Sequence, residues 1–536
     1  MSFAPKDERG QIVNPFAGRD VNWLVKHRAE TRGDHTFLIW EPFIGDRQTW
    51  TYAEFHNKVE RVAAGLHARG INAGDTILVH LDNSPEMEFL WFACQRIGAI
   101  VVTTNTRSSD DELAYFADNC GAVAAITQPE LAESVARSAK NIKWLTVTSH
   151  LVDGGEPAAN LMPDREASFS QLDGDPANLP ELPADPWRPG SVQFTSGTTS
   201  RPKGVLWTQG NALWGARTSA VHENLNQSDT HLVMMPSFHT NARTYSILPT
   251  MWTGGSVVLM PRFSASRFWD IAVRNGCTWA SMLPFFCKAV MQQPTPATHN
   301  FRMFGMNANE LPFDDHFNVR SIGWWGMTET ISHGIIGEAR MRNRSMTTGR
   351  PASGYDIRVL RDDRVTPVGP GEVGHLECRG WRGIQMFYEY LGNATAMRES
   401  FTDDGWFNTG DRVRLEEDGQ LTFADRDKDM LKVGGENVAA SEIERIIAVI
   451  PGVYEVAVVA QQHKMLDEVP VAFIIPTADI NVDQPGDLAN RVLAACKDKL
   501  ADFKVPRDVF VVSEMPRSTL EKIHKAELRK RLPVAG

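Results

Sequence analysis

Two stretches of the chain alternate apolar, strand-like runs with segments of helical spacing. The first stretch covers residues 1 to about 130. Its apolar runs lie at residues 37–40, 77–81, 99–102 and 123–126. Residues 21–31 and a segment opening at Pro85 have helical spacing, and Thr51 with Glu54 predicts a capping box before a helix that Gly70 ends. This alternation predicts a parallel sheet covered by helices on both faces.

A second region with the same alternation follows a connection, residues 151–190, that is rich in Asp, Pro, Gly and Ala. The pattern predicts strands at 257–260, 278–283 and 302–305, and helices around 267–274 and 284–292. After about Gly349 the runs become short and are separated by Gly and Asp, which predicts a small antiparallel sheet or a distorted barrel. From Lys428 onward an α+β pattern follows. We therefore predict a first domain over residues 1–427 and a second over 428–536.

Composition narrows the class of protein. A chain of 536 residues is too long for one core, and its 42% hydrophobic and 23% charged residues are ordinary for a globular protein. The net charge of -11 argues against nucleic-acid binding. Six scattered Cys predict reduced thiols in a cytoplasmic protein rather than a zinc site or disulfides. Without a signal peptide or a run of about 18 apolar residues, stable membrane insertion is not expected.

A short loop behind the strand-like run 191–194 carries hydroxyl groups, glycine and one lysine. Its members are Thr195, Ser196, Gly197, Thr198, Thr199 and Lys203. Backbone N–H groups, hydroxyls and an ammonium can bind a polyphosphate. The glycine and the lysine are in the wrong order for the P-loop of ordinary nucleotidases. A surface Ser/Thr turn is the alternative interpretation.

Four further clusters follow in order, and each has a structural alternative when taken alone. They are GWWGMTE at 323–329, GWFNTGD at 405–411, the charged segment 425–437, and the basic segment PRSTLEKIHK at 516–525. An aromatic face can stack on a purine, and the carboxylate of Glu329 can hold Mg²⁺ beside phosphates. Asp411 on a glycine turn can bind a ribose diol or simply cap the turn.

Together these clusters resemble one family. TSGTTSRPKG, GMTE, WFNTGD, DRDKDMLKVGGEN and PRSTLEKIHK match, in order, the motif series of the acyl-adenylate-forming enzymes. That superfamily includes acyl-CoA synthetases, nonribosomal peptide adenylation domains and firefly luciferase. The resemblance covers essentially the whole chain. The segments FLIWEPF and TWTYAEF look most like the crotonobetaine/carnitine-CoA ligase branch.

The resemblance implies a fold and a reaction. The fold is α/β: a large N-terminal domain of two parallel-type α/β sheets plus a small distorted β-barrel, and a small mobile α+β C-terminal domain. The reaction is a two-step ligation in which a small or medium carboxylic acid attacks ATP-Mg²⁺, giving acyl-AMP and pyrophosphate, and coenzyme A then displaces AMP. An adenylating enzyme that serves a carrier-protein thiol and a non-enzymatic nucleotide-binding relative are the alternatives. The KVGGEN loop and the absence of a carrier domain favour coenzyme A, and Glu329 with Lys522 argues against the third class. The sequence does not fix the oligomeric state, for which a homodimer is one alternative.

The resemblance also implies roles for individual residues. The Thr195–Lys203 loop would hold the β- and γ-phosphates, Trp325 would stack on adenine, and Thr328 and Glu329 would contact the α-phosphate and Mg²⁺. Further nucleotide-binding candidates are Asn307, Ala308, Asn309, Trp324, Gly326 and Met327. The remaining candidates are Asp411 and Arg426 for ribose, Lys522 as the adenylation lysine, Lys428 as the hinge, and Lys432, Gly434 and Gly435 for the pantetheine thiol.

The acyl group would lie beside His239, the candidate gate of the pocket. Phe238, Met306, Trp324 and Ile335 are its candidate lining residues. Trp324 is bulky and argues against a long fatty chain, and Arg243 is expected to hold structure rather than a second acidic group. Aromatic faces suit an onium acid through cation–π contact, but aryl and short-chain acids fit the same space. The chain departs from the family pattern at Trp325, usually Tyr, at Glu521, usually Gly, and in the polar turn 307–310, whose amides could add contacts to the base.

Overall fold

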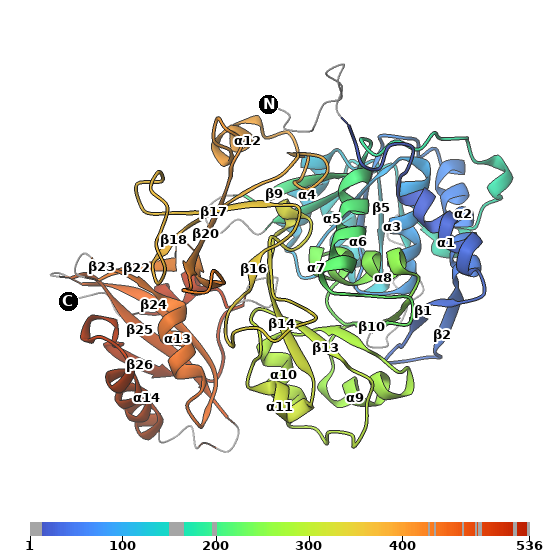
Figure 1. The fold of residues 1–536 in the computed structure, drawn as a ribbon. Helices are drawn as coiled ribbons and strands as arrows, with labels where there is room; N and C mark the ends of the chain where they lie inside the picture. The colour runs from blue at the N-terminus through green and yellow to red at the C-terminus, as the bar shows by residue number, and fades with distance from the viewer. Residues whose placement is uncertain are drawn as a thin grey trace. The chain divides into compact units, whose positions relative to one another are not determined.

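The computed structural model (Figure 1) describes residues 13–148, 166–195, 201–426, 429–433, 436–463, 466–477, 480, 485–517 and 523–532. The chain divides into two compact units. The first contains residues 1–357 and 378–407, and the second contains residues 358–377 and 408–536. Both segments PRSTLEKIHK and KVGGEN are only partly within the described residues.

An eight-stranded sheet forms one half of the first unit. Its order is β19 (Glu389–Tyr390), β9 (Lys203–Thr208), β8 (Pro189–Thr195), β4 (Ile100–Thr103), β3 (Thr76–His80), β5 (Ala124–Thr127), β6 (Trp144–Val147), β7 (Glu166–Ser168). The strands from β8 to β7 are parallel, and β9 and β19 are antiparallel to their neighbours. Every residue of β3 is buried, as expected of a parallel strand with both faces covered.

A nine-stranded sheet forms the other half. Its order is β16 (Arg350–Pro351), β15 (Ile335–Ile336), β14 (Arg320–Trp325), β13 (Met303–Met306), β12 (Trp279–Ser281), β10 (Thr230–Val233), β11 (Ser256–Leu259), β1 (Thr36–Trp40), β2 (Gln48–Thr51). The strands from β14 to β1 are parallel, with antiparallel strands at both edges. The two alternating stretches of sequence therefore correspond to two mainly parallel sheets, as predicted.

Helices of the first unit cover these sheets. They are α1 (Val21–Arg32), α2 (Tyr52–Ala68), α3 (Pro85–Ile97), α4 (Asp110–Cys120), α5 (Ala132–Ser138), α6 (Gln209–His222), α7 (Thr240–Ala242), α8 (Leu248–Thr253), α9 (Ala265–Arg274), α10 (Pro284–Met291), α11 (Phe313–Phe317) and α12 (Ala394–Ser400), with a π-helix at Arg243–Ile247. The predicted capping box opens α2, where the Thr51 hydroxyl accepts from the Glu54 N–H and the Glu54 carboxylate accepts from the Thr51 N–H. Helix α6 packs on α8, and both contact α1 (Figure 1). One large apolar cluster runs through this layer and includes the fully buried Trp91, Trp207 and Trp279.

The second unit contains the remaining sheets. A four-stranded sheet, most of whose residues belong to this unit, has the order β17 (Asp356–Leu360), β18 (Val373–Arg379), β20 (Phe407–Leu415), β21 (Leu421–Arg426). It occupies the region where the sequence predicts a small antiparallel sheet or barrel. A five-stranded sheet contains β22 (Met430–Val433), β23 (Glu436–Ala439), β24 (Val453–His463), β25 (Asp467–Pro476) and β26 (Asp508–Val511), with α13 (Ala440–Ala448), α14 (Pro485–Lys499) and α15 (Lys525–Lys530).

The pattern of the sequence missed some elements. Strand β9 and helix α6 follow the predicted phosphate loop directly, yet neither was expected from the apolar spacing. Asp411, expected on a glycine turn, lies inside strand β20, because β18 and β21 supply its backbone with neighbours on both sides. The predicted boundary between residues 427 and 428 stays a prediction, since both residues lie outside the described ones. Among the described residues, no helix has the length and apolar character needed to cross a membrane.

Candidate functional site

The β8–β9 hairpin fixes both ends of the predicted phosphate loop. Thr195 pairs with Lys203 in the antiparallel register, and the Thr195 hydroxyl donates to the Lys203 carbonyl at 3.4 Å. Ser196, Gly197, Thr198 and Thr199 lie outside the described residues. Their predicted contacts with phosphate stay predictions, but the hairpin determines where this loop leaves and rejoins the sheet.

Strand β14 ends in a turn that carries Thr328 and Glu329. The backbone of this turn is bound from two other segments: the Trp207 indole N–H donates to the Thr328 carbonyl at 2.9 Å, and the Phe387 N–H donates to the Glu329 carbonyl at 2.9 Å. The Thr240 hydroxyl lies 3.4 Å from the Thr328 hydroxyl. Three segments that are far apart in the sequence therefore hold the two predicted catalytic residues.

Tyr390 connects this turn to the β8–β9 hairpin, called the phosphate hairpin below. Its hydroxyl donates a 2.9 Å hydrogen bond to Oε1 of Glu329, and the Lys203 ammonium lies over its ring, 4.2 Å from the centroid. Glu329 is 3% exposed and Tyr390 is 2% exposed. Burial, and next the negative charge of Glu329, raise the pKa of Tyr390 far above its ordinary value. The phenol therefore remains protonated and acts as the donor.

The residues after Glu329 adopt a strained turn. Ile331 has φ of +65°, a conformation that a β-branched residue rarely adopts. Hydroxyl groups fix the turn: Thr244 Oγ1 donates to the Ile331 carbonyl at 2.5 Å, and the Tyr355 phenol donates to the Thr330 carbonyl. The Ser332 N–H donates to the Tyr355 oxygen at 3.3 Å. Strain of this kind persists only where the surroundings enforce it, and it occurs often at functional sites.

Trp325 presents its indole beside this turn. A methyl group on Gly334 would lie 2.7 Å from Cζ3 of Trp325, so the glycine lies directly against the ring. The Gly334 N–H also donates to the Trp325 carbonyl at 2.9 Å. Trp325 is 6% exposed, and its role as a stacking platform for a purine stays a prediction. Gly326 and Met327 form the backbone that leads from this ring to Thr328.

Trp324 points to the opposite side of β14, since successive strand residues alternate faces. Its ring is parallel to that of Trp279, with centroids 6.4 Å apart, stacks on His333 at 4.7 Å, and lies 5.6 Å from Tyr245. A side chain at Gly305 would overlap the Trp324 ring. The structure thus places Trp324 and Trp325 on opposite sides of β14, although both residues were predicted from the sequence to bind the nucleotide. Met306 and Ile335, two predicted pocket residues, are fully buried.

A buried acid lies behind this aromatic cluster. Glu223 and His333 are each 0% exposed, with His333 Nε2 3.6 Å from Glu223 Oε1. Within the described parts of the chain, neither oxygen of Glu223 has a hydrogen-bond partner. Burial raises the pKa of Glu223 well above its ordinary value and lowers the pKa of His333 well below its own. Burial therefore favours the neutral form of both groups.

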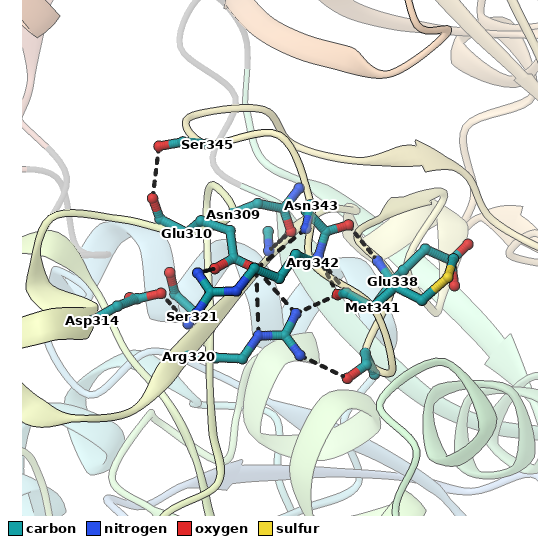
Figure 2. Close-up of polar contacts among 12 residues, drawn as sticks. Asn309, Glu310, Asp314, Arg320, Ser321, Glu338, Met341, Arg342, Asn343 and Ser345 are labelled. Carbon is teal, nitrogen blue, oxygen red and sulfur yellow. Dashed lines mark hydrogen bonds and ion pairs between the residues drawn. The ribbon is translucent and has the colours of Figure 1, made fainter.

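The predicted adenine-side turn, residues 307–310, is built on a polar network (Figure 2). Asn309 is completely buried, its Oδ1 accepts from the Gly323 N–H at 2.7 Å, and its Nδ2 donates to Thr347 Oγ1 at 3.1 Å. The side-chain amide of Asn309 therefore holds β14 to the 347 region. Asn307 is exposed and Ala308 is buried. The side-chain amide of Asn309 is therefore bound within the protein, whereas that of Asn307 is exposed and could contact the adenine base.

Glu310 fastens the same turn from the outer side. It has a φ of +45°, and its Oε1 accepts from Arg320 Nη2 at 3.0 Å and from the Asn343 N–H at 3.2 Å. Arg342 lies 3.6 Å from the other carboxylate oxygen, and the Ser345 hydroxyl donates to the Glu310 carbonyl at 2.7 Å (Figure 2). These contacts tie the turn to the loop formed by residues 338–345.

On the predicted acyl side, His239 is half-buried, and its ring lies 4.5 Å from that of Phe238. Its role as a gate stays a prediction. Arg243 is fully buried, pairs with Glu88 at 2.6 Å, and lies 4.4 Å from the centroid of Trp91. Its guanidinium is committed to these partners, which confirms the expected structural role.

In the second unit, strand pairing brings the two ribose candidates together. Asp411 faces Arg426 across β20 and β21, and Arg426 Nε lies 3.5 Å from Asp411 Oδ1. Lys432 is exposed, and its backbone N–H donates to Glu468 at 2.8 Å. Lys428, Gly434, Gly435 and Lys522 lie outside the described residues, so their roles stay predictions.

The predicted Mg²⁺ fits this donor set. In the described residues there is no group of three or more His, Cys, Asp or Glu that could hold a metal ion by itself. Mg²⁺ in nucleotide sites is commonly bound by one or two carboxylates, with phosphates and water as the other ligands. Glu329, one carboxylate that Tyr390 connects to Lys203 of the hairpin, suits that arrangement.

Sequence reasoning missed Tyr390, Trp207 and Thr240. Their hydrogen bonds to Glu329 and Thr328 join residues far apart in the chain. Trp207 and Tyr390 lie on neighbouring strands that the apolar pattern did not predict. No local spacing signals such contacts.

Comparison with known proteins gives the same assignment along the chain. Residues 25–391 match the family model "AMP-binding enzyme", and residues 442–522 match "AMP-binding enzyme C-terminal domain". A crotonobetaine/carnitine–CoA ligase from Salmonella enteritidis PT4 is 32% identical over 527 residues, which cover 96% of this chain and 99% of that protein.

Solved structures share the fold. The anthranilate CoA ligase AuaEII in complex with anthranoyl-AMP has a TM-score of 0.84 at 24% identity, covering 96% of this chain and 98% of that one. O-succinylbenzoate coenzyme A synthetase from Bacillus subtilis, in complex with ATP and a magnesium ion, has a TM-score of 0.79 at 24% identity, covering 94% and 99%. The predicted family resemblance, α/β fold class, enzyme class and cofactors are confirmed at the level of the family.

Proposed function

The chain belongs to the AMP-binding enzyme family, and we propose that it activates a compact carboxylic acid as acyl-AMP and then transfers the acyl group to coenzyme A. The observation that carries this proposal is the meeting of Lys203, Tyr390 and Glu329 at the end of the phosphate hairpin. A cation and a carboxylate at this position suit a site that binds the polyphosphate of ATP.

The first half-reaction must bring two anions together. A carboxylate oxygen attacks the α-phosphorus of ATP, the bond from that phosphorus to the bridging oxygen breaks, and pyrophosphate leaves. Lys203 and the 195–199 loop would hold the departing phosphates, Thr328 would contact the α-phosphate, and Lys522 would bridge the acid and the α-phosphate. Mg²⁺, held by Glu329, would neutralise phosphate charge. Asp411 and Arg426 would orient the ribose, and Trp325 the adenine.

The second half-reaction needs a different set of residues. The thiolate of coenzyme A attacks the acyl carbonyl carbon, and the bond to the AMP oxygen breaks. Lys432, Gly434 and Gly435 would line the approach of the pantetheine thiol. Lys428 would be the hinge about which the second domain rotates, so that this loop replaces Lys522 at the site. The predicted mobility of the second domain is thus part of the proposal.

The stack around Trp324 supports a short acyl pocket. Its ring packs against Trp279, His333 and Gly305, and this packing leaves no room for a long chain where the ring lies. A betaine-like acid is our first candidate, supported by the aromatic faces and by the 32% identity to a crotonobetaine/carnitine–CoA ligase. Aryl and short-chain acids are the alternatives, which the same space accommodates.

A carboxylate panel read by mass spectrometry tests the proposal. We expect acid-dependent pyrophosphate release without coenzyme A, and a thioester once coenzyme A is added. Thioester with neutral acids and none with betaines would remove the betaine candidate. An acyl-AMP that reacts with a carrier-protein thiol but not with coenzyme A would favour the carrier-dependent alternative.

The variant Lys522→Ala separates the two half-reactions. It should abolish adenylation and still form thioester from supplied acyl-AMP, because Lys522 would serve only the first step. Equal loss of both half-reactions would contradict the two-pose assignment.

We also propose a cytoplasmic location and a homodimer. The six cysteines are all free and buried, which supports a reducing compartment. Cell fractionation tests the location, and analytical ultracentrifugation tests the assembly.

A further inference from the structure

We propose that Tyr390 is a positioning residue that holds Lys203 and Glu329 apart and correctly oriented before nucleotide binds. The inference rests on the proposed roles of Lys203 and Glu329 toward phosphate and Mg²⁺. It assigns a role to a residue on β19, a two-residue strand outside every motif of the sequence.

Strand pairing sets the position of Tyr390. Tyr390 pairs with Val205 across the antiparallel β19–β9 pair, and Val205 lies two residues after Lys203. The centroid of the Tyr390 ring is 4.6 Å from that of Phe387. The Phe387 N–H in turn donates to the Glu329 carbonyl. The same short segment thus holds the backbone of Glu329 through Phe387 and its carboxylate through Tyr390.

The ring and the hydroxyl group of Tyr390 contact different residues. The ring face attracts the Lys203 ammonium without neutralising it, because the attraction comes from the ring quadrupole and not from a negative charge. The hydroxyl occupies Oε1 of Glu329 and so fixes the rotation of the carboxylate. An aromatic ring without a hydroxyl could do only the first, and an aliphatic residue could do neither.

This arrangement prevents a competing one. A lysine and a glutamate within reach of each other form an ion pair, and phosphate and Mg²⁺ would have to break that pair in order to bind. Tyr390 gives each charge a different partner, and both contacts are compatible with a bound polyphosphate. Preorganised charges avoid reorganisation at the moment of reaction.

Equilibrium binding of a non-hydrolysable ATP analogue tests the inference. Calorimetric titrations with Mg²⁺ and with chelator give the factor by which the metal tightens binding. Tyr390→Phe keeps the ring and should leave the metal-free Kd within about 2-fold, while the Mg²⁺ factor falls about 5-fold, the value of one hydrogen bond. Tyr390→Leu should also weaken metal-free binding, because the Lys203 contact is lost.

Tyr52→Phe is the matched control. Tyr52 is equally buried, and its hydroxyl donates to the Gly255 carbonyl at 2.8 Å, but it contacts neither Lys203 nor Glu329. Tyr52→Phe should change neither the metal-free nor the Mg²⁺-dependent Kd. Its melting temperature measures how much stability the loss of a buried phenol hydroxyl costs.

Two outcomes overturn the inference: an unchanged Mg²⁺ factor in Tyr390→Phe, or metal-free binding in Tyr390→Leu that is as tight as in wild type. Glu329→Gln identifies a failure of the underlying proposal. If that variant keeps the wild-type Mg²⁺ factor, Glu329 is not the metal ligand. If it loses the factor while Tyr390→Phe does not, only the role of Tyr390 fails.

Discussion

The two sides of strand β14 are built by different physical means. On one side, the turn that carries Thr328 and Glu329 is fixed by directional hydrogen bonds from Trp207, Phe387 and Tyr390. On the other side, the ring of Trp324 is fixed by stacking, and the buried carboxyl of Glu223 behind it has no hydrogen-bond partner among the described residues.

This difference indicates what each side can tolerate. Hydrogen bonds specify the positions of individual atoms, which phosphate chemistry requires, and the loss of one partner leaves a buried polar group unsatisfied. Stacked rings set the volume of the space beside them, and a substitution of one ring changes that volume. The turn should therefore be intolerant of small polar changes, whereas the aromatic side should respond to changes in size.

The largest effect is expected from Glu329→Gln on the turn. The amide keeps the shape and can still accept from Tyr390, but the negative charge for Mg²⁺ is gone. Adenylation should fall by about 100-fold or more, since metal stabilisation of the reacting phosphate is worth several kcal/mol. Pyrophosphate release at saturating acid measures this. An activity within about 3-fold of wild type would contradict the metal role.

Trp324→Ala tests the aromatic side. Removal of the ring opens the space beside Gly305, so the ratio of kcat/KM for a longer acid to that for a shorter one should rise about 10-fold or more. Trp324 is only partly buried, so its loss should cost less than the about 3–5 kcal/mol of a fully buried Trp, to be measured by urea unfolding. Trp324→Phe is the control and should lie between the two. An unchanged ratio would place the acyl group elsewhere.

A smaller effect is expected from Tyr355→Phe, which removes one hydroxyl from the strained turn. The Thr330 carbonyl and the Ser332 N–H would lose their hydrogen bonds to the phenol and keep only the 2.6 Å hydrogen bond between them. Unfolding free energy should fall by about 1–2 kcal/mol and kcat several-fold. Differential scanning calorimetry and single-turnover adenylation check both. If stability falls and kcat does not, the turn does not need its hydroxyl groups for catalysis.

Glu223→Gln should have the smallest effect on activity, and its effect on stability should depend on pH. Burial raises the pKa of Glu223, so the folded protein keeps a proton that the unfolded chain has lost above about pH 4.5. Stability from this group is therefore complete below that pH and is lost as pH rises toward the folded pKa. Glu223→Gln cannot titrate and should gain stability relative to wild type between about pH 5 and pH 8. His333 titrates in both proteins, so the difference between their urea midpoints isolates Glu223; a constant difference would indicate an ordinary pKa.

Local patterns in the sequence were enough to predict several parts of the fold. The Thr51–Glu54 capping box and the apolar runs of the two parallel sheets depend on neighbouring residues, and both are present in the structure. Strand β20 was missed at Asp411, because its Gly and Asp residues favour a turn and only pairing with β18 and β21 makes it a strand. The chemistry was predicted by another route: each motif is a run of neighbouring residues, and the order of the motifs along the chain resembles one family.

The sequence by itself determined the succession of elements, the order of the motifs and, through that order, the family. The tertiary structure decided which side chains share a site: Tyr390 with Lys203 and Glu329, Trp324 with His333 rather than with Trp325, and Arg243 with Glu88. The physical reason is the range of the forces. Periodicity and capping act over a few residues of chain, whereas hydrogen bonds and ring contacts between distant segments exist only once the sheets have brought those segments together.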